Sequence, residues 1–144
     1  MKFFLIFIIS IFISTSVYPA GSDDNTLVKP SSYKKAVTLI KDKNYKEGLD
    51  ILENILEKSK YRKDPDILNE YAFALRKTGD LKKAEEFYSK ALKIDPKHKG
   101  ALEYYGELLV DTKRIKEAKE ILKKLEKCKC EEFSELKDYI NKTN

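Results

Sequence analysis

The sequence predicts an all-α fold, an α-solenoid of about three helical hairpins followed by a C-terminal capping helix. Apolar residues recur from Ser31 onward at the i, i+3, i+4, i+7 spacing of one helix face. Helix-breaking residues are rare, with 5 Gly and 4 Pro in 144 residues. The helical pattern also repeats with a period of about 34 residues, which is typical of stacked hairpins.

The N-terminus has the pattern of a secretory signal peptide. Lys2 is followed by the apolar run 3–13, which is shorter than the roughly 20 residues that cross a bilayer. We expect residues 1–20, or 1–16, to be removed, by cleavage after Ala20 or after Ser16. An uncleaved N-terminal anchor is the alternative. The pattern therefore predicts an exported protein, in the bacterial periplasm or outside the cell, without a transmembrane span once the signal is removed.

A polar stretch separates this signal from the helical domain. Residues 21–30 contain Gly, Ser, Asp and Asn without apolar periodicity, so we expect a flexible spacer there. The helical domain is predicted over residues 31–142.

The middle hairpin is the clearest unit. Asp64 and Pro65 are typical of an N-cap and a first helical position. Gly79 can adopt the positive φ that ends a helix, Asp80 can cap the next helix, and Pro96 stops it. The apolar faces of its two helices comprise Ile67, Leu68, Tyr71, Ala72, Leu75, Leu81, Ala84, Phe87, Tyr88, Ala91 and Leu92.

The flanking residues overlay this unit, which gives repeats at about 29–64, 65–98 and 99–132. Small residues recur at two positions of each unit and should let the two helices of a hairpin cross closely. These pairs are Ala36 and Gly48, Ala72 and Ala84, and Gly106 and Ala118. In the first unit, Asn44 and Glu47 have the spacing of a capping box.

The pattern resembles the tetratricopeptide repeat (TPR) family. The residues that carry the resemblance are Leu68-x2-Tyr71-Ala72-x2-Leu75, Gly79-Asp80, Ala84-x3-Tyr88, Ala91 and Asp95-Pro96. Leu68 stands where the motif usually has Trp, and the outer units have Lys43 and Lys113 in place of the turn Gly. The resemblance covers residues 29–132 and implies a concave groove, lined by the first helix of each unit, that binds a protein or peptide partner.

The resemblance also implies which side chains contact the partner. They are Asn69, Phe73, Arg76, Lys77, Glu103, Tyr104, Glu107 and Asp111, with Tyr33, Val37, Ile40 and Lys41 at the matching positions of the first unit. Phe73 and Tyr104 should face the groove as exposed aromatic anchors. Glu103, Glu107 and Asp111 form a stripe at i, i+4, i+8, which is either simply solvated or favours a segment carrying Lys or Arg.

Two further expectations concern the same groove. Arg76 and Lys77 are expected to pair with an acidic group of the bound segment. The resemblance does not extend to chaperone-binding TPRs with a carboxylate clamp, because Tyr33 and Val37 occupy positions where that clamp has Lys and Asn.

A cysteine pair precedes the predicted capping helix, which spans about 131–142. This ending resembles that of small exported bacterial TPR proteins, in which a cysteine pair precedes the terminal helix. Cys128 and Cys130 are too few ligands for a metal site. Side chains at i and i+2 point to opposite sides of a helix, so a disulfide between them requires a non-helical backbone. A structural disulfide and a thiol-redox protein that uses this pair both remain open.

The charge pattern excludes other classes of function. The net charge is +5, from 29 basic and 24 acidic residues, but only Arg62, Arg76 and Arg114 are arginines. Lysines mixed with glutamates indicate solvated helix faces rather than a nucleic-acid surface. Contact with anionic lipid is the less favoured alternative for the densest lysine cluster, which comprises Lys123, Lys124, Lys127 and Lys129.

Catalytic chemistry has no support in the sequence. His98 lies in a turn between two units without a partner residue nearby, so we expect it to be exposed. No phosphate loop or nucleophile motif is present, and we expect no cofactor, no metal and no enzymatic activity. The sequence therefore predicts a non-catalytic adaptor or assembly factor of the cell envelope.

Overall fold

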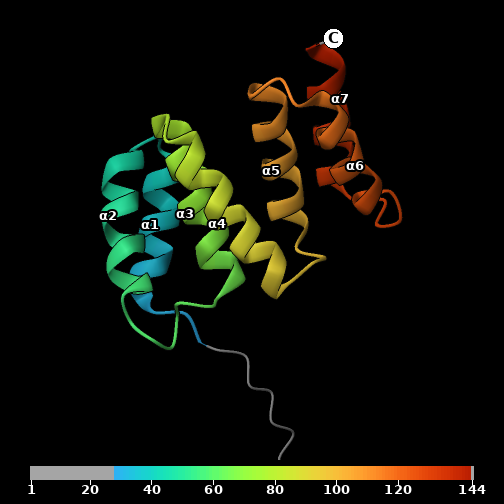
Figure 1. Cartoon of the computed structure of the whole chain (residues 1–144). Helices are drawn as coiled ribbons and strands as arrows, with labels where there is room; N and C mark the ends of the chain where they lie inside the picture. The colour runs from blue at the N-terminus through green and yellow to red at the C-terminus, as the bar shows by residue number, and fades with distance from the viewer. Residues whose placement is uncertain (1–27, 144) are drawn as a thin grey trace, which may run out of the picture.

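The computed structural model describes residues 28–143, so the predicted signal peptide and most of the spacer lie outside the described residues. Within this range the chain forms seven α-helices and no strand (Figure 1). This confirms the predicted all-α solenoid. The helices are α1 (Ser31–Lys41), α2 (Tyr45–Leu56), α3 (Pro65–Thr78), α4 (Leu81–Ile94), α5 (Lys99–Asp111), α6 (Ile115–Leu125) and α7 (Glu131–Lys142).

The helices pack as three consecutive hairpins, α1/α2, α3/α4 and α5/α6, with α7 against α5 and α6 at the C-terminal end (Figure 1). The first helices of the hairpins contact one another, α1 with α3 and α3 with α5, and α5 also contacts α7. Between residues 28 and 143, the second helices α2, α4 and α6 make no such contact with one another. Because the inner elements of an arc lie closer together than the outer ones, α1, α3, α5 and α7 form the concave face.

The ends of the middle helices follow the sequence signals. The carboxylate of Asp64 accepts hydrogen bonds from the backbone N–H groups of Asp66 and Ile67, at 3.0 and 3.1 Å. Gly79 adopts a φ of 94°, and Asp80 accepts a hydrogen bond from the N–H of Lys83 at 3.1 Å. Local chemistry therefore defines the start, the turn and the second start of this hairpin.

The two outer turns adopt the same bend without glycine. Lys43 and Lys113 have φ values of 64° and 65°, in the left-handed region where an L-residue costs about 1–2 kcal/mol. The next residue, Asn44, donates its N–H to the carbonyl of Leu39 at 2.8 Å, as Asp80 does to Leu75 in the middle turn at 3.0 Å.

The predicted capping box at Asn44 is wrong. Asn44 is the residue before α2, but its side chain accepts no hydrogen bond from that helix. The side chains of Asn44 and Glu47 are both exposed. Water therefore competes for an amide whose capping bond contributes only about 1 kcal/mol.

Small residues create space at two kinds of helix contact. A Cβ atom on Gly48 would lie 2.7 Å from Cγ1 of Ile40, so this glycine allows α1 and α2 to pack closely, as expected. A Cβ atom on Gly106 would instead lie 2.5 Å from Cδ2 of Leu136 on α7. Gly106 therefore admits the capping helix, a role that the hairpin overlay does not predict.

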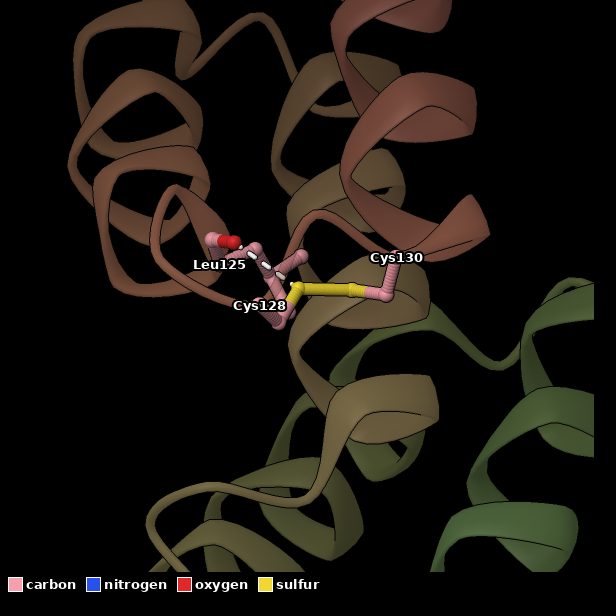
Figure 2. The surroundings of a disulfide bond; sticks show 3 residues. All are labelled: Leu125, Cys128 and Cys130. Atoms are coloured by element: carbon pink, nitrogen blue, oxygen red, sulfur yellow. Dashed lines mark hydrogen bonds between the residues drawn. A yellow bond between two sulfur atoms is a disulfide. The ribbon is translucent and has the colours of Figure 1, made fainter.

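The connection between α6 and α7 contains a disulfide bond (Figure 2). It joins Cys128 and Cys130, whose Cα atoms are 5.1 Å apart. The residue between them, Lys129, has a φ of 49°, so the backbone is non-helical where the pairing requires it. The sulfur of Cys128 lies 2.8 Å from the carbonyl oxygen of Leu125, and both cysteines pack against the core formed by α5, α6 and α7.

Candidate functional site

An aromatic hollow occupies the N-terminal half of the concave face. Its cavity volume is about 220 Å³. The rings of Phe73 on α3 and Tyr104 on α5 lie with centroids 4.7 Å apart, and Tyr45 lies edge-on to Phe73 at 6.5 Å. The lining residues, which define the aromatic hollow here, are Val37, Ile40, Lys41, Lys43, Tyr45, Glu70, Phe73 and Tyr104.

Charges of both signs surround this hollow. Lys41, Lys43 and Lys77 are exposed, and the ammonium of Lys77 lies 5.0 Å from the ring centroid of Phe73. Glu70 is half-buried, and burial raises the pKa of its carboxyl. The hollow therefore offers an aromatic floor together with cationic groups that keep contact with water.

Phe73 and Tyr104 are less exposed than the sequence predicts. Both are half-buried and pack against the core cluster of the first two hairpins. Each ring thus contacts the core and also lines the aromatic hollow. Removing either ring will therefore cost stability, contrary to the expectation that these aromatics contribute only to binding.

The C-terminal half of the concave face contains a closed ionic network, here called the Arg76 network. The guanidinium of Arg76 donates to Glu107 Oε2 at 2.5 Å and to Asp111 Oδ2 at 2.8 Å through Nε. It also donates to the hydroxyl of Tyr139 on α7 at 3.2 Å, and that hydroxyl donates to Asp111 Oδ1 at 2.7 Å. Four residues thus connect α3, α5 and α7.

The prediction that Arg76 pairs with a bound segment is wrong. Its side chain is only 4% exposed, and its donors already bond to the protein. Burial lowers the pKa of Arg76, but the hydrogen bonds and charges of Glu107 and Asp111 outweigh burial and raise it above the usual range. Glu107 and Asp111 are likewise neutralised within the chain, so they do not present a free acidic stripe.

Two other predicted contact residues are buried. Glu103 is 4% exposed and lies beside Glu135 of the capping helix. Burial raises the pKa of Glu103, and its hydrogen bond with Glu135 raises it further. Asn69 is also 4% exposed, between α3 and the start of α5. Neither side chain is available to a partner in this conformation, because α7 and the next hairpin cover them.

His98 is not the exposed turn residue that the sequence predicts. Its Nδ1 accepts a hydrogen bond from the N–H of Ala101 at 3.1 Å and so caps α5. Its Nε2 lies 2.8 Å from Asp66, whose other carboxylate oxygen lies 2.6 Å from the ammonium of Lys29. The bond to Asp66 raises the pKa of His98 despite partial burial. This cluster connects the second and third hairpins at one edge of the concave face.

The residues predicted for the groove therefore divide into two groups. Phe73, Lys77 and Tyr104 lie at the open aromatic hollow, whereas Asn69, Arg76, Glu103, Glu107 and Asp111 are engaged elsewhere. Sequence reasoning did not select Tyr45, since it begins a second helix rather than a first. A usable signal is that Tyr45 directly follows the tight turn, which places it at the mouth of the groove.

Two other classes of site find no support among residues 28–143. No group of three or more His, Cys, Asp or Glu side chains is arranged to hold a metal ion. In the same range, every helix is too short or too polar to cross a lipid bilayer.

Comparison with known proteins finds a family resemblance in part of the chain. The sequence model of the tetratricopeptide repeat family matches residues 78–129. A TPR repeat-containing protein of Dictyostelium discoideum is 38% identical over 72 residues, which cover 50% of this chain and 26% of that protein. The chain thus spans about a quarter of the length of this curated relative.

Solved TPR structures share the fold at low sequence identity. The TPR domain of Arabidopsis OM64 has a TM-score of 0.68 at 17% identity, over 78% of this chain and 93% of that one. The Yersinia enterocolitica type III secretion chaperone SycD, in complex with a peptide of the translocator YopD, has a TM-score of 0.64 at 18% identity. That match covers 78% of this chain and 86% of SycD. Residues 78–129 therefore match the tetratricopeptide repeat model, and the described chain has the fold of TPR domains.

Proposed function

We propose that this protein is a non-catalytic adaptor or assembly factor that binds a peptide segment of another protein in the aromatic hollow. The observation that carries the proposal is the Phe73–Tyr104 pair, half-exposed over a cavity of about 220 Å³ in the concave face. A similar fold in SycD has been solved with a peptide of YopD, which supports peptide binding as a use of this architecture.

The lining of the hollow suggests the chemistry of the bound segment. One apolar or aromatic side chain would pack on Phe73 and Tyr104, where contact with aromatic rings contributes most of the affinity. Acidic groups next to that anchor would meet Lys41 and Lys77, which are exposed at its rim. This assignment replaces the predicted attraction of a basic segment by the acidic stripe.

Photo-crosslinking tests the proposal without removing an aromatic ring. Phe73 is replaced by p-benzoylphenylalanine, and Lys119, which is exposed on α6, receives the same group as a matched control. After irradiation of the native cell envelope, we expect adducts with a discrete partner from position 73 and none from position 119. Adducts that form only from position 119 would show that partners bind outside the groove.

A rim variant gives an independent readout. Lys41→Glu/Lys77→Glu should lower the yield of the partner in a pull-down several-fold, because it reverses charges beside the hollow. Lys119→Glu/Lys127→Glu makes the same change in net charge at exposed positions away from the hollow and should retain the partner. Equal retention by both variants would contradict a role for the rim.

We further propose that the protein acts after export, in the periplasm or outside the cell. The signal-like pattern of residues 1–20 and the disulfide between Cys128 and Cys130 support this location, because disulfides persist mainly in oxidising compartments. Mass spectrometry of the native protein should find an N-terminus at residue 17 or 21. An intact N-terminus on cytosolic material would refute export.

The thiol-redox alternative uses the same cysteine pair. The two half-buried cysteines pack on the core beside α7, which favours a structural role over exchange with other thiols. In a disulfide-exchange assay, we therefore expect no activity that depends on Cys128. Activity that disappears in Cys128→Ser would instead establish the redox function.

A further inference from the structure

A second hollow lies between the second helices α2 and α4, away from the concave face. Its floor is apolar and comprises Leu56, Leu68, Phe87 and Ile94, and its cavity volume is about 640 Å³. Ile94 is 43% exposed, which is unusual for a large aliphatic side chain in this compact stack. The volume falls within the range of about 300–1,000 Å³ that is typical of ligand sites.

Four cations form the rim of this hollow, which we call the basic hollow. Arg62 and Lys63 come from the connection between the first two hairpins, and Lys90 and Lys93 come from α4. All four are exposed, and none forms an ion pair within the described part of the chain. No acidic side chain from residues 28–143 lines the cavity. The charged side chains that line this hollow are therefore all positive, and the nearest glutamates, Glu53 and Glu57, line the adjoining hollow that shares Arg62.

The next pair of second helices is joined by an ion pair in which the basic residue is neutralised by a glutamate. Between α4 and α6, Arg114 lies 2.7 Å from Glu85, and Glu85 also accepts a hydrogen bond from Tyr105 at 2.9 Å. Between α2 and α4 the ion pair is Lys83 with Glu53, at 3.9 Å, and neither residue lines the basic hollow. The ammonium of Lys90 instead lies 4.2 Å from the ring centroid of Phe87, where it retains its capacity to bind an anion.

We propose that the basic hollow is a second docking site, for an acidic amphipathic peptide segment of a partner protein. One large apolar side chain of the segment occupies the floor beside Phe87 and Ile94. Asp or Glu side chains on either side of it pair with Lys90 and Lys93 on α4 and with the cations of the opposite connection. The basic rim favours a segment with negative charge, and the apolar floor favours one that also carries large apolar side chains.

The shape of the site favours a peptide over a membrane surface. A bilayer is flat on this scale, whereas the apolar groups of the floor lie within a hollow, with Leu68 only 2% exposed. An inserted side chain reaches such a floor, while a lipid surface contacts mainly the lysine ammonium groups at the rim. Anionic vesicles therefore serve as the competing occupant in the experiment.

Fluorescence anisotropy with a defined probe tests the proposal. The probe is a fluorescein-labelled peptide of repeated Glu-Glu-Leu-Phe units, and its counterpart has Lys in place of Glu. We expect the acidic peptide to bind the parent protein and the basic peptide not to bind. Lys90→Glu/Lys93→Glu should weaken binding about tenfold or more, and Ile94→Ser should weaken it several-fold.

The matched control has the same charge change and the same i, i+3 spacing on another helix. Lys116→Glu/Lys119→Glu alters two exposed lysines of α6 and should leave the affinity for the acidic peptide unchanged. Equal affinity of the parent and Lys90→Glu/Lys93→Glu would overturn the proposal, as would equal losses in the test and control variants. Binding to phosphatidylglycerol vesicles that depends on Lys90 and Lys93, without binding of the peptide, would overturn it in favour of a membrane. Lys41→Glu/Lys77→Glu should leave the affinity for the acidic peptide unchanged, and a loss there would assign the probe to the aromatic hollow instead. The crosslink from position 73 reports on the aromatic hollow separately, so either site can fail without the other.

Discussion

The two halves of the concave face both use side chains of α3 and α5, one to leave a hollow and the other to close an ionic network. In the N-terminal half, Phe73 and Tyr104 leave a hollow open to solvent, with exposed lysines around it. In the C-terminal half, Arg76 draws Glu107 and Asp111 into a network that Tyr139 of α7 completes. The comparison teaches that position within a repeat determines which way a side chain faces, but the neighbouring helix determines whether it is free to bind.

The largest expected effect comes from breaking the closed half. Arg76→Ala leaves Glu107 and Asp111 facing each other without their cation, in a site where the arginine side chain was 4% exposed. Removing one partner of such a buried pair typically costs about 3–5 kcal/mol in the free energy of unfolding. Urea denaturation measures this loss. Arg62→Ala, at an exposed arginine without an ion pair, should change it by less than about 0.5 kcal/mol, and similar values for both would show that the network contributes little.

The next largest effect concerns the helix crossings in the second and third hairpins, where added side-chain volume should lower stability to a similar extent in both. Ala84 and Ala118 are both 0% exposed, so Ala84→Leu and Ala118→Leu each place extra methylenes into a packed crossing. We expect each to lower the free energy of unfolding by about 1–3 kcal/mol. Unchanged urea midpoints for both variants would mean that the crossings are not closely packed at these positions.

Glu103 provides a pH-dependent comparison within the closed half. Its folded-state pKa is raised by burial and by Glu135, so the folded chain retains a proton that the unfolded chain releases above about pH 4.5. The stability that this proton contributes is complete below pH 4.5 and is lost as the pH rises through the raised folded-state pKa. Glu103→Gln should therefore stabilise the protein at pH 8 by about 1–2 kcal/mol and reduce the pH dependence of its unfolding.

The control for this experiment is Glu126→Gln, at an exposed position in the connection after α6. It should leave the difference between the urea midpoints at pH 5 and pH 8 as it is in the parent. If Glu103→Gln also leaves that difference unaltered, then Glu103 is ionised in the folded protein and α7 does not exclude water from its carboxyl.

The smallest expected effect compares the turns beside the two halves. Lys43 lines the aromatic hollow, Lys113 lies in the corresponding turn after α5, and both have a positive φ. Lys43→Gly and Lys113→Gly should each stabilise the protein by about 0.5–1 kcal/mol. Glycine adopts the left-handed conformation without the strain of a Cβ atom, and this gain exceeds the cost of the added entropy of the unfolded chain. Thermal unfolding measures both. A stabilising effect in one turn alone would show that the backbones of the two turns differ in strain, in addition to the difference between the side chains of the two halves.

The sequence predicts the fold because its signals are local. Asp64, Gly79 and Asp80 act on N–H groups and dihedral angles within three residues, so their effects are the same in any fold that contains them. The small residues of each hairpin also lie within one repeat. A periodic pattern of this kind specifies both the helices and the way they stack.

The site was predicted less well because its contacts are distant in sequence. Arg76 depends on Tyr139 in the capping helix, and His98 depends on Asp66 in the preceding hairpin. The spacing of Glu103, Glu107 and Asp111 correctly places them on one face of α5, but spacing does not show that Arg76 and α7 cover that face. Burial and ion pairing depend on which helices pack together, and this information is absent from the period of a single helix.

The place of α7 also bears on how this protein can change in evolution. Repeat proteins commonly lengthen by duplication of a hairpin, and a copy inserted before α7 would carry Tyr139 and Leu136 one repeat further from their present partners. Arg76 would lose its hydroxyl partner, and Gly106 would face a new helix in place of the side chain for which it leaves room. Tandem duplication at this end would therefore require compensating substitutions in both the old and the new last hairpin, so the number of repeats is constrained by the chemistry of the cap.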